Sequence, residues 1–327
     1  MELDTKDILL NKEIDFEHFV NKHKNEKCVI VGGSQTMHDF DYENFNGKKI
    51  VLGTAILRLE NRFNPDYLIS ANNHMPVPEI DEHLKILNSY KNMTWIFSDT
   101  AVYCDIWTKS ESFLNENLKI NYSCYDDRHF GRKKCNPEKK CCSFLNRYPL
   151  RKNIYDILVE KSSLNKDDFT FGMGASVAEG ALAIAILMGF KEIYLQGVSL
   201  TLDNKYQFLR DKNQKYFGYP SKYADDLLYR TSKPLRKKFF FYYLKKLDFM
   251  PYISSYYERT VNYFFNRSVF RKNHNQSMLN FSYLAKISKL RSQKIYCTSE
   301  NSNLKNIENI HFINTKFGYL KKDSKKI

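Results

Sequence analysis

The fold of this 327-residue chain is decided by the stretch Phe171-Gly172-Met173-Gly174-Ala175-Ser176-Val177-Ala178-Glu179. Ser176 and Glu179 have the spacing of a capping box, which predicts a helix that starts at Ser176. The glycines before it allow a tight turn, so backbone N–H groups and the positive end of the helix dipole point out of the turn, where anions bind. The next residues, through Met188, are apolar almost all round, which predicts a helix packed against a sheet.

The stretches on either side complete a nucleotide-binding α/β unit. Gly189 ends the predicted helix, and residues 191–197 read as a buried strand. Near the start of the chain, the β-branched run of residues 28–31 predicts a central strand that ends in the tight turn Gly32-Gly33-Ser34. Further strands are expected at 49–53, 66–70, 93–98, 294–298 and 311–313, with a helix at 276–290. Strands and helices alternate, which favours a mostly parallel sheet.

Neither turn carries the full G-x-G-x-x-G fingerprint, and no acidic residue ends the second strand where a ribose clamp would lie. This departure argues against an NAD enzyme. Four of the seven cysteines are crowded together, at Cys124, Cys135, Cys141 and Cys142. The spacing of these four suits free thiols better than a zinc site. The acidic pairs Asp167-Asp168 and Asp225-Asp226 lack the D-x-D spacing of metal-dependent transferases, so neither a metal nor a cofactor is expected.

The net charge of +14 indicates an acidic partner. Basic and aromatic residues alternate from Lys233 to Lys272, which suits the interface of an anionic membrane, but a helical pair that buries its rings against the sheet has the same pattern. No nucleic-acid-binding motif is visible. No apolar run reaches the roughly 20 residues that cross a bilayer, and the start lacks a secretory signal. We therefore expect a cytoplasmic protein that associates peripherally with the inner membrane.

With both turns and a late histidine, the chain resembles the bacterial sialyltransferases of glycosyltransferase family 42, which use a CMP-activated nonulosonic acid. The sharpest match is residues 183–197, where the family has a nearly identical helix, glycine and strand, and residues 28–37 resemble its opening strand and G-N-G-P-S-type loop. The resemblance implies an α/β fold that is Rossmann-like, with a mostly parallel sheet of a GT-A-like variant and a basic aromatic helical lid.

The alternation of predicted strands and helices, and the basic aromatic stretch that interrupts it, divide the chain into four expected segments. They are a helical leader at 1–25, a nucleotide-sugar-binding Rossmann-like core at 26–215, a lid or membrane-proximal insertion at 216–275, and C-terminal elements that return to the core at 276–327.

The resemblance also implies site residues. The positions that fall on the family's nucleotide- or donor-binding turns and strand ends are Gly32, Gly33, Ser34, Thr54, Asn72, Asn73, Gly174, Ser176 and Gly197. Tyr206 matches a tyrosine that reaches the CMP phosphate, and His274 falls close to the family's general base, with His74 as the competing base. Thr54 stands where the family has an asparagine, and Ser199 where it has the acid of G-I-D.

These residues imply an inverting, metal-independent glycosyltransferase that moves sialic acid or a related nonulosonic acid from a CMP-sugar to a cell-surface glycan, such as lipooligosaccharide or capsule. The helix start and Ser176 would hold the phosphate, Tyr206 would donate to it, and His274 would take the acceptor proton. The expected partners are a nucleotide sugar, a glycan or glycolipid acceptor and an anionic membrane, and a homo-oligomer is compatible with them. Two alternatives stay open: a pterin-diphosphokinase-like or flagellin-modifying relative with the same core, and a binding protein without chemistry.

Overall fold

The computed structural model describes residues 14–59, 63–70, 85, 87–98, 119, 121–125, 153–165, 168–169, 171, 176–200, 267–299 and 302–314. The chain divides into two units. The larger unit comprises Met1–Met75, Glu79–Leu209 and His274–Ile327, and the smaller comprises Pro76–Pro78 and Arg210–Asn273.

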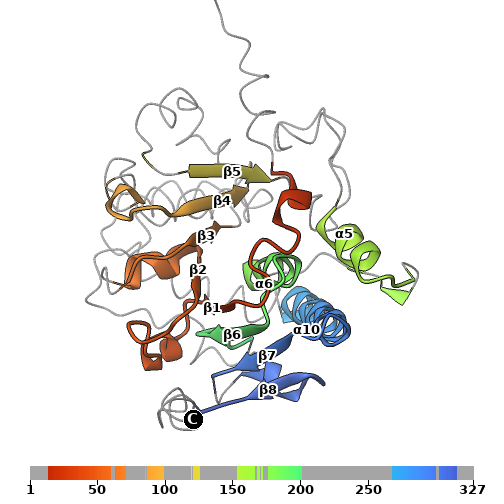
Figure 1. Ribbon diagram of the computed structural model, residues 1–327. Coiled ribbons are helices and arrows are strands. Elements are labelled where there is room, and N and C mark those ends of the chain that lie inside the picture. The colour runs from red at the N-terminus through yellow and green to blue at the C-terminus, as the bar shows by residue number, and fades with distance from the viewer. Residues whose placement is uncertain are drawn as a thin grey trace, which may run out of the picture. The chain divides into compact units, whose positions relative to one another are not determined.

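Within the described residues, eight parallel strands form one sheet in the order β5-β4-β3-β2-β1-β6-β7-β8 (Figure 1). The strands are β1 (Lys27–Val31), β2 (Lys48–Leu52), β3 (Tyr67–Ser70), β4 (Thr94–Ser98), β5 (Asn121–Tyr125), β6 (Glu192–Gln196), β7 (Lys294–Cys297) and β8 (Ile310–Phe312). Strands β1 to β5 follow one another in one direction and β6 to β8 in the other. The strand order therefore reverses between β1 and β6.

Side chains on the two faces of the sheet enter two separate apolar clusters, because successive strand residues point to opposite faces. Ile30 and Ile295 pack with Ile184 in the cluster that the helices cover, whereas Val29 and Trp95 pack in the other cluster. Figure 1 shows α5 (Ile154–Lys161), α6 (Val177–Leu187) and α10 (Arg267–Leu290) on the same side of the sheet. Short 3-10 helices complete the described elements: η1 (Phe16–Phe19), η2 (Gln35–Asp39), η3 (Gly53–Arg58) and η8 (Asn303–Asn306).

The structure confirms the Rossmann-like parallel sheet that the sequence predicts. The seven predicted strands are present within a residue or two of their expected bounds, and α6 begins after Ser176 as the capping box indicates. Strand β5 and helix α5 were not predicted. Helix α10 begins at Arg267 rather than at residue 276, so His274 lies inside a helix and not in a loop.

The end of the predicted leader packs into the larger unit. Ile14 and Phe16 are buried in the cluster that contains α6. The backbone N–H of Asn21 donates to the carbonyl of Leu187 at 2.9 Å, and that of His23 donates to the carbonyl of Met188 at 2.8 Å. These bonds satisfy carbonyl groups that the end of α6 leaves without a partner inside the helix.

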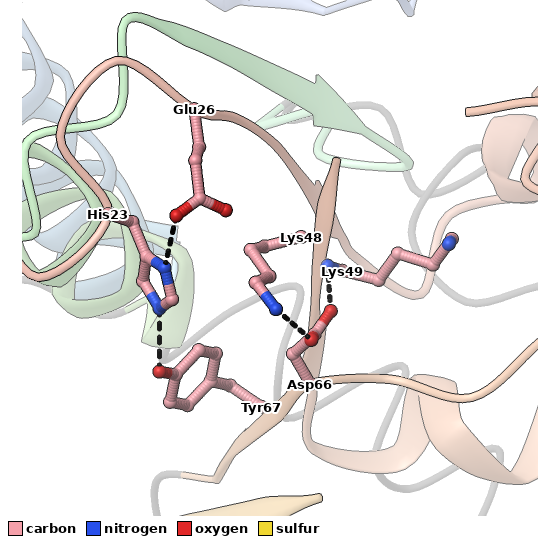
Figure 2. A network of polar contacts seen from close by, with 6 residues as sticks. All are labelled: His23, Glu26, Lys48, Lys49, Asp66 and Tyr67. Atoms are coloured by element: carbon pink, nitrogen blue, oxygen red, sulfur yellow. Dashed lines mark hydrogen bonds and ion pairs between the residues drawn. The ribbon is translucent and has the colours of Figure 1, made fainter. Parts of the chain in front are cut away.

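Ion pairs and hydrogen bonds hold the amino ends of the strands (Figure 2). The Nζ of Lys48 lies 2.9 Å from Oδ1 of Asp66, and the backbone N–H of Lys49 donates to Oδ2 of the same carboxylate, also at 2.9 Å. Asp66 directly precedes β3, and both lysines lie at the start of β2. The carboxylate therefore pins these two strands together at the edge opposite their carboxyl ends.

A buried histidine extends this contact set toward β1 (Figure 2). The Nε2 of His23 lies 2.8 Å from the hydroxyl of Tyr67, its Nδ1 lies 3.0 Å from Oε1 of Glu26, and its ring stacks on Phe190. Burial, with the neighbouring charges of Asp66 and Glu26, raises the pKa of Tyr67 to about 12, so the phenol keeps its proton. The residues that Figure 2 labels lie at the amino ends of the strands, and their contacts stabilise the fold.

Several expectations fall on residues outside the described ranges. They include most of the predicted lid, at 216–266, the cysteines at 135, 141 and 142, and the tail. Among the helices that the structure does describe, none combines the length and the apolar character needed to span a membrane.

Candidate functional site

The carboxyl ends of β1 and β6 meet at the point where the strand order reverses. In open α/β sheets, ligands bind in the crevice outside the strand ends at such a point. The register pairs Val31 with Gln196, the last residues of the two strands. After these residues the chain continues as Gly32-Gly33-Ser34 on one side and Gly197 on the other. The glycine turn and the strand end that the sequence singles out are therefore neighbours in space.

The two backbones approach each other closely at this point. The N–H of Gly32 donates to the carbonyl of Gln196 at 2.8 Å, and the N–H of Ser34 donates to the carbonyl of Gly197 at 3.0 Å. A Cβ placed on Gly32 would lie 2.5 Å from the carbonyl oxygen of Gly197, and a Cβ on Gly197 would lie 2.5 Å from that of Gly32. Both positions therefore require glycine, and Gly197 also has φ +66°.

Gly33 differs from its neighbours in this respect. A Cβ at Gly33 would meet no atom of the described residues within 4 Å. Gly33 is therefore packed less tightly against the described residues than Gly32 and Gly197, which are needed where the strand ends meet.

A network of buried hydroxyl and amide groups ties this turn to β6 and β7. The Oγ1 of Thr36 lies 3.0 Å from Oγ of Ser34 and 2.7 Å from Oγ of Ser299. Gln196, which is fully buried, donates through Nε2 to the carbonyl of Thr36 and accepts at Oε1 from the hydroxyl of Thr298. The network fixes the loop after β1 against the ends of two other strands.

Sequence reasoning missed four members of this network: Thr36, Gln196, Thr298 and Ser299. A signal was present, because Gln196 and Thr298 are polar residues at the ends of otherwise apolar predicted strands. Polar side chains at the carboxyl ends of parallel strands gather at one edge of a sheet, where ligands bind.

The start of α6 lies at this same edge. Helix α6 ends at Leu187 and β6 begins at Glu192, so the helix runs antiparallel to the strand and its first turn lies near the strand's carboxyl end. The Oγ of Ser176 accepts the N–H of Ala178 at 3.1 Å, and Oε1 of Glu179 accepts the N–H of Ser176 at 3.3 Å. The predicted capping box is confirmed.

Helix α10 brings His274 toward the site. This helix precedes β7 as α6 precedes β6, so its earlier turns lie toward the carboxyl edge. His274 is partly buried, and this burial lowers the pKa of its imidazole from the ordinary value. A neutral imidazole accepts a proton, as a general base must.

Two side chains of α10 bind the start of α6. The hydroxyl of Ser277 donates to Oε1 of Glu179, and Nδ2 of Asn280 donates to Oε2 at 2.7 Å. Burial raises the pKa of Glu179, and the hydrogen bonds from Ser277, Asn280 and the backbone of Ser176 oppose that rise. Figure 1 shows the two helices side by side.

The structure thus brings Gly32, Gly33 and Ser34 together with Gly197, and it places Ser176 at the same edge of the sheet, with His274 on a helix that contacts the start of α6. The remaining site predictions lie outside the described residues, namely Asn72, Asn73, His74, Gly174 and Tyr206, and of Thr54 only the backbone, in η3, is described. Within the described part of the chain, no three His, Cys, Asp or Glu side chains are grouped as metal ligands would be.

No family model matches this sequence, and no curated protein matches it either. Solved structures that resemble the fold include the sialyltransferase CST-II in complex with trisaccharide acceptor and CMP, at 16% identity over 89% of this chain and 87% of that chain, with a TM-score of 0.41. Another is the monofunctional alpha-2,3-sialyltransferase Cst-I from Campylobacter jejuni, at 14% identity over 91% of this chain and 83% of that chain, with a TM-score of 0.40. The likeness is distant, and by itself it does not carry the activity of those enzymes over to this chain.

Proposed function

We propose that this chain is a glycosyltransferase that moves sialic acid or a related nonulosonic acid from a CMP-sugar to a glycan acceptor. The observation that supports this most is that a glycine turn packs against the end of β6 where the strand order reverses, and that the capped start of α6 lies at this same edge of the sheet. A helix N-terminus at a strand switch point is a favourable place for the phosphate of a nucleotide. Helix α10, which contacts this helix start, adds a partly buried histidine.

Each group has a separate task in the proposed reaction. The hydroxyl of Ser176 and the backbone N–H groups around Gly174, at the positive end of the α6 dipole, bind the phosphate of CMP. The nucleoside lies against the turn at Gly33, which the network around Gln196 holds in place. Tyr206 donates a hydrogen bond to the phosphate as its charge develops, and Asn72 orients the donor sugar.

His274 removes the proton from the acceptor hydroxyl, whose oxygen attacks the anomeric carbon while the bond to the phosphate oxygen of CMP breaks. Attack from the face opposite the leaving group inverts the configuration at that carbon. The hydroxyl of Ser176 and the backbone N–H groups around Gly174 stabilise the charge on the leaving phosphate, so we propose a reaction that needs no metal. General-base assistance of this kind contributes about 10²- to 10⁴-fold to the rate.

The positive net charge supports a second part of the proposal, that the acceptor is a glycolipid or surface glycan reached at an anionic membrane. Binding to vesicles with and without anionic lipid tests this part separately. If the chain binds neither kind of vesicle, the membrane part is wrong and the transferase part stands.

The decisive experiment offers the purified chain a panel of CMP-, UDP- and GDP-sugars. Calorimetry measures binding, and release of CMP in the presence of EDTA measures turnover. We expect binding of CMP-sugars and turnover without divalent metal. Binding of UDP- or GDP-sugars alone would refute the CMP assignment, and Mg²⁺-dependent transfer from ATP would favour the diphosphokinase-like alternative.

A further inference from the structure

A single buried carboxylate joins the two helices that meet at the candidate site. The side chain of Glu179 belongs to a residue only 2% exposed, and its two oxygens accept hydrogen bonds from both helices. The backbone N–H of Ser176 and the hydroxyl of Ser277 donate to Oε1, while the amide of Asn280 donates to Oε2. A capping box needs only the first of these bonds.

An aromatic contact holds the same two regions together. The ring of Tyr283, on α10, meets the ring of Phe171 edge-on at 5.5 Å between centroids, and Phe171 stacks on Tyr155 of α5 at 4.0 Å. Phe171 directly precedes the glycine turn that leads into α6. Helix α10 is therefore anchored by polar and apolar contacts, and the hydrogen bond from Ser277 lies in the turn of α10 next to His274.

His274 lies three residues before Ser277 on the same helix. Residues three apart lie on the same side of an α-helix, one turn from each other. The bond between Ser277 and Glu179 thus fixes the turn of α10 that carries the imidazole.

We infer that Glu179 is a positioning residue, which holds the His274 turn of α10 against the start of α6 and so sets the imidazole relative to the phosphate-binding end of that helix. This role rests on the proposed function in one respect, the use of His274 as the base. The anchoring itself is a property of the fold and can be measured without any reaction.

The substitution Glu179→Gln disturbs the anchor while keeping its shape. If the new amide nitrogen takes the place of Oε2, it faces the donor group of Asn280, whose own oxygen already accepts from Gln276 at 3.0 Å. If the nitrogen takes the place of Oε1 instead, it faces the N–H donor of Ser176. In the first orientation the contact from Asn280 to α6 is lost, and in the second the capping bond from Ser176 is lost, so either orientation weakens the junction around Glu179.

The first measurement is the pKa of the His274 imidazole by NMR in the full chain without ligand. We expect Glu179→Gln to raise it toward the ordinary histidine value, because a loosened turn exposes the ring to water. If Glu179→Gln does not fold, the milder variant Ser277→Ala, which removes a single donor, takes its place in the experiment. It should also raise the pKa of the His274 imidazole. The matched control is Glu192→Gln, which removes the same charge at the amino edge of the sheet, where the carboxylate pairs with Lys27, and should leave the pKa unchanged.

The second measurement is a double-mutant cycle on kcat for release of CMP. We expect Glu179→Gln to lower kcat by up to about 100-fold, the effect of a misplaced catalytic group, and to add nothing in a His274→Ala background. An equal loss in both backgrounds would show that Glu179 acts independently of His274 and would overturn the inference. So would an unchanged imidazole pKa in both the Glu179 and the Ser277 variants.

The two proposals fail in different ways. If His274→Ala keeps the full rate, the assignment of the base is wrong, while the NMR result still decides whether Glu179 anchors the helix. If the wild-type chain releases no CMP from any donor, the proposed function fails and the NMR arm again decides the anchoring.

Discussion

The imidazole of His274 is the residue whose protonation the proposed reaction depends on. Burial lowers its pKa, so the neutral, proton-accepting form persists to lower pH than for an exposed histidine, whose pKa is about 6.5. Activity should be lost only as the pH falls through this lowered value. We therefore expect the acidic limb of the kcat/KM profile to lie below pH ~6.5.

Two outcomes would contradict this expectation. An acidic limb at or above the ordinary histidine pKa would show that burial does not control the base. If His274→Ala keeps an acidic limb of the kcat/KM profile at the same pH, that limb belongs to another titrating group.

The contact between Gly32 and Gly197 predicts a loss of stability. In Gly197→Ala the new methyl group would lie 2.5 Å from the carbonyl oxygen of Gly32, at a backbone φ of +66° that side chains rarely adopt. We expect the free energy of unfolding to fall by about 1–3 kcal/mol, measured by urea denaturation. Gly33→Ala is the matched control for stability, because its methyl group meets no described atom within 4 Å. Equal losses in the two variants would refute the close-approach argument.

Among single residues, sequence patterns identified the glycines and Ser176 but not the side chains that hold them. Glu179 was recognised only as half of a capping box, since that role depends on a neighbour three positions away. Its bond to Ser277 spans 98 positions of sequence. No local pattern reports a contact of that kind.

At the scale of elements, the N-cap of α6 can be compared with the N-cap of α5, and the comparison separates an effect on stability from an effect on the binding of CMP. Ser176→Ala removes the hydroxyl oxygen that accepts the N–H of Ala178 at 3.1 Å at the start of α6. Asn153→Ala removes the amide oxygen that accepts the N–H of Tyr155 at 2.8 Å at the start of α5. Each should lower the free energy of unfolding by about 1 kcal/mol. Only the Ser176 variant should also weaken the binding of CMP, measured by calorimetry.

The comparison of these two caps tests where the phosphate binds. Equal weakening of CMP binding by both variants would mean that the loss follows from general destabilisation. Unchanged binding in Ser176→Ala would mean that its hydroxyl takes no part in holding the phosphate.

Whole elements were predictable where they are buried on both sides. Strands β1 and β6 have apolar interiors, at 28–31 and 193–195, and a glycine follows each strand, which is typical of the centre of a parallel sheet. Strand β5 reads Asn-Tyr-Ser-Cys-Tyr and lies at the edge of the described sheet, so its polar sequence carries no such signal. The start of α10 was missed because its first residues belong to the basic aromatic stretch that was assigned to the lid.

At the scale of the molecule, the two edges of the sheet have different roles. Asp66→Ala removes the partner of Lys48 and the acceptor of the Lys49 N–H at the amino edge. We expect the free energy of unfolding to fall by about 1–2 kcal/mol, while the affinity for CMP stays unchanged because the carboxyl edge is untouched. Thermal or urea unfolding and calorimetry check the two halves of this prediction.

An exposed ion pair serves as the control. Lys289 and Glu308 lie 3.9 Å apart with both side chains largely exposed, so Lys289→Ala should change stability by no more than about 0.5 kcal/mol. A fall in CMP affinity in Asp66→Ala would contradict the separation of the two edges.

The sequence by itself determined which segments form buried strands, where α6 begins, and which turns carry glycine. These features depend on side-chain preferences and on hydrogen bonds between near neighbours, which the order of residues encodes directly. Only the tertiary structure decided that the strand order reverses between β1 and β6, that Thr36, Gln196 and Ser299 meet at that point, and that Glu179 joins α6 to α10. Those contacts arise from packing between distant segments, since strands that follow one another in sequence can be added to either side of a sheet.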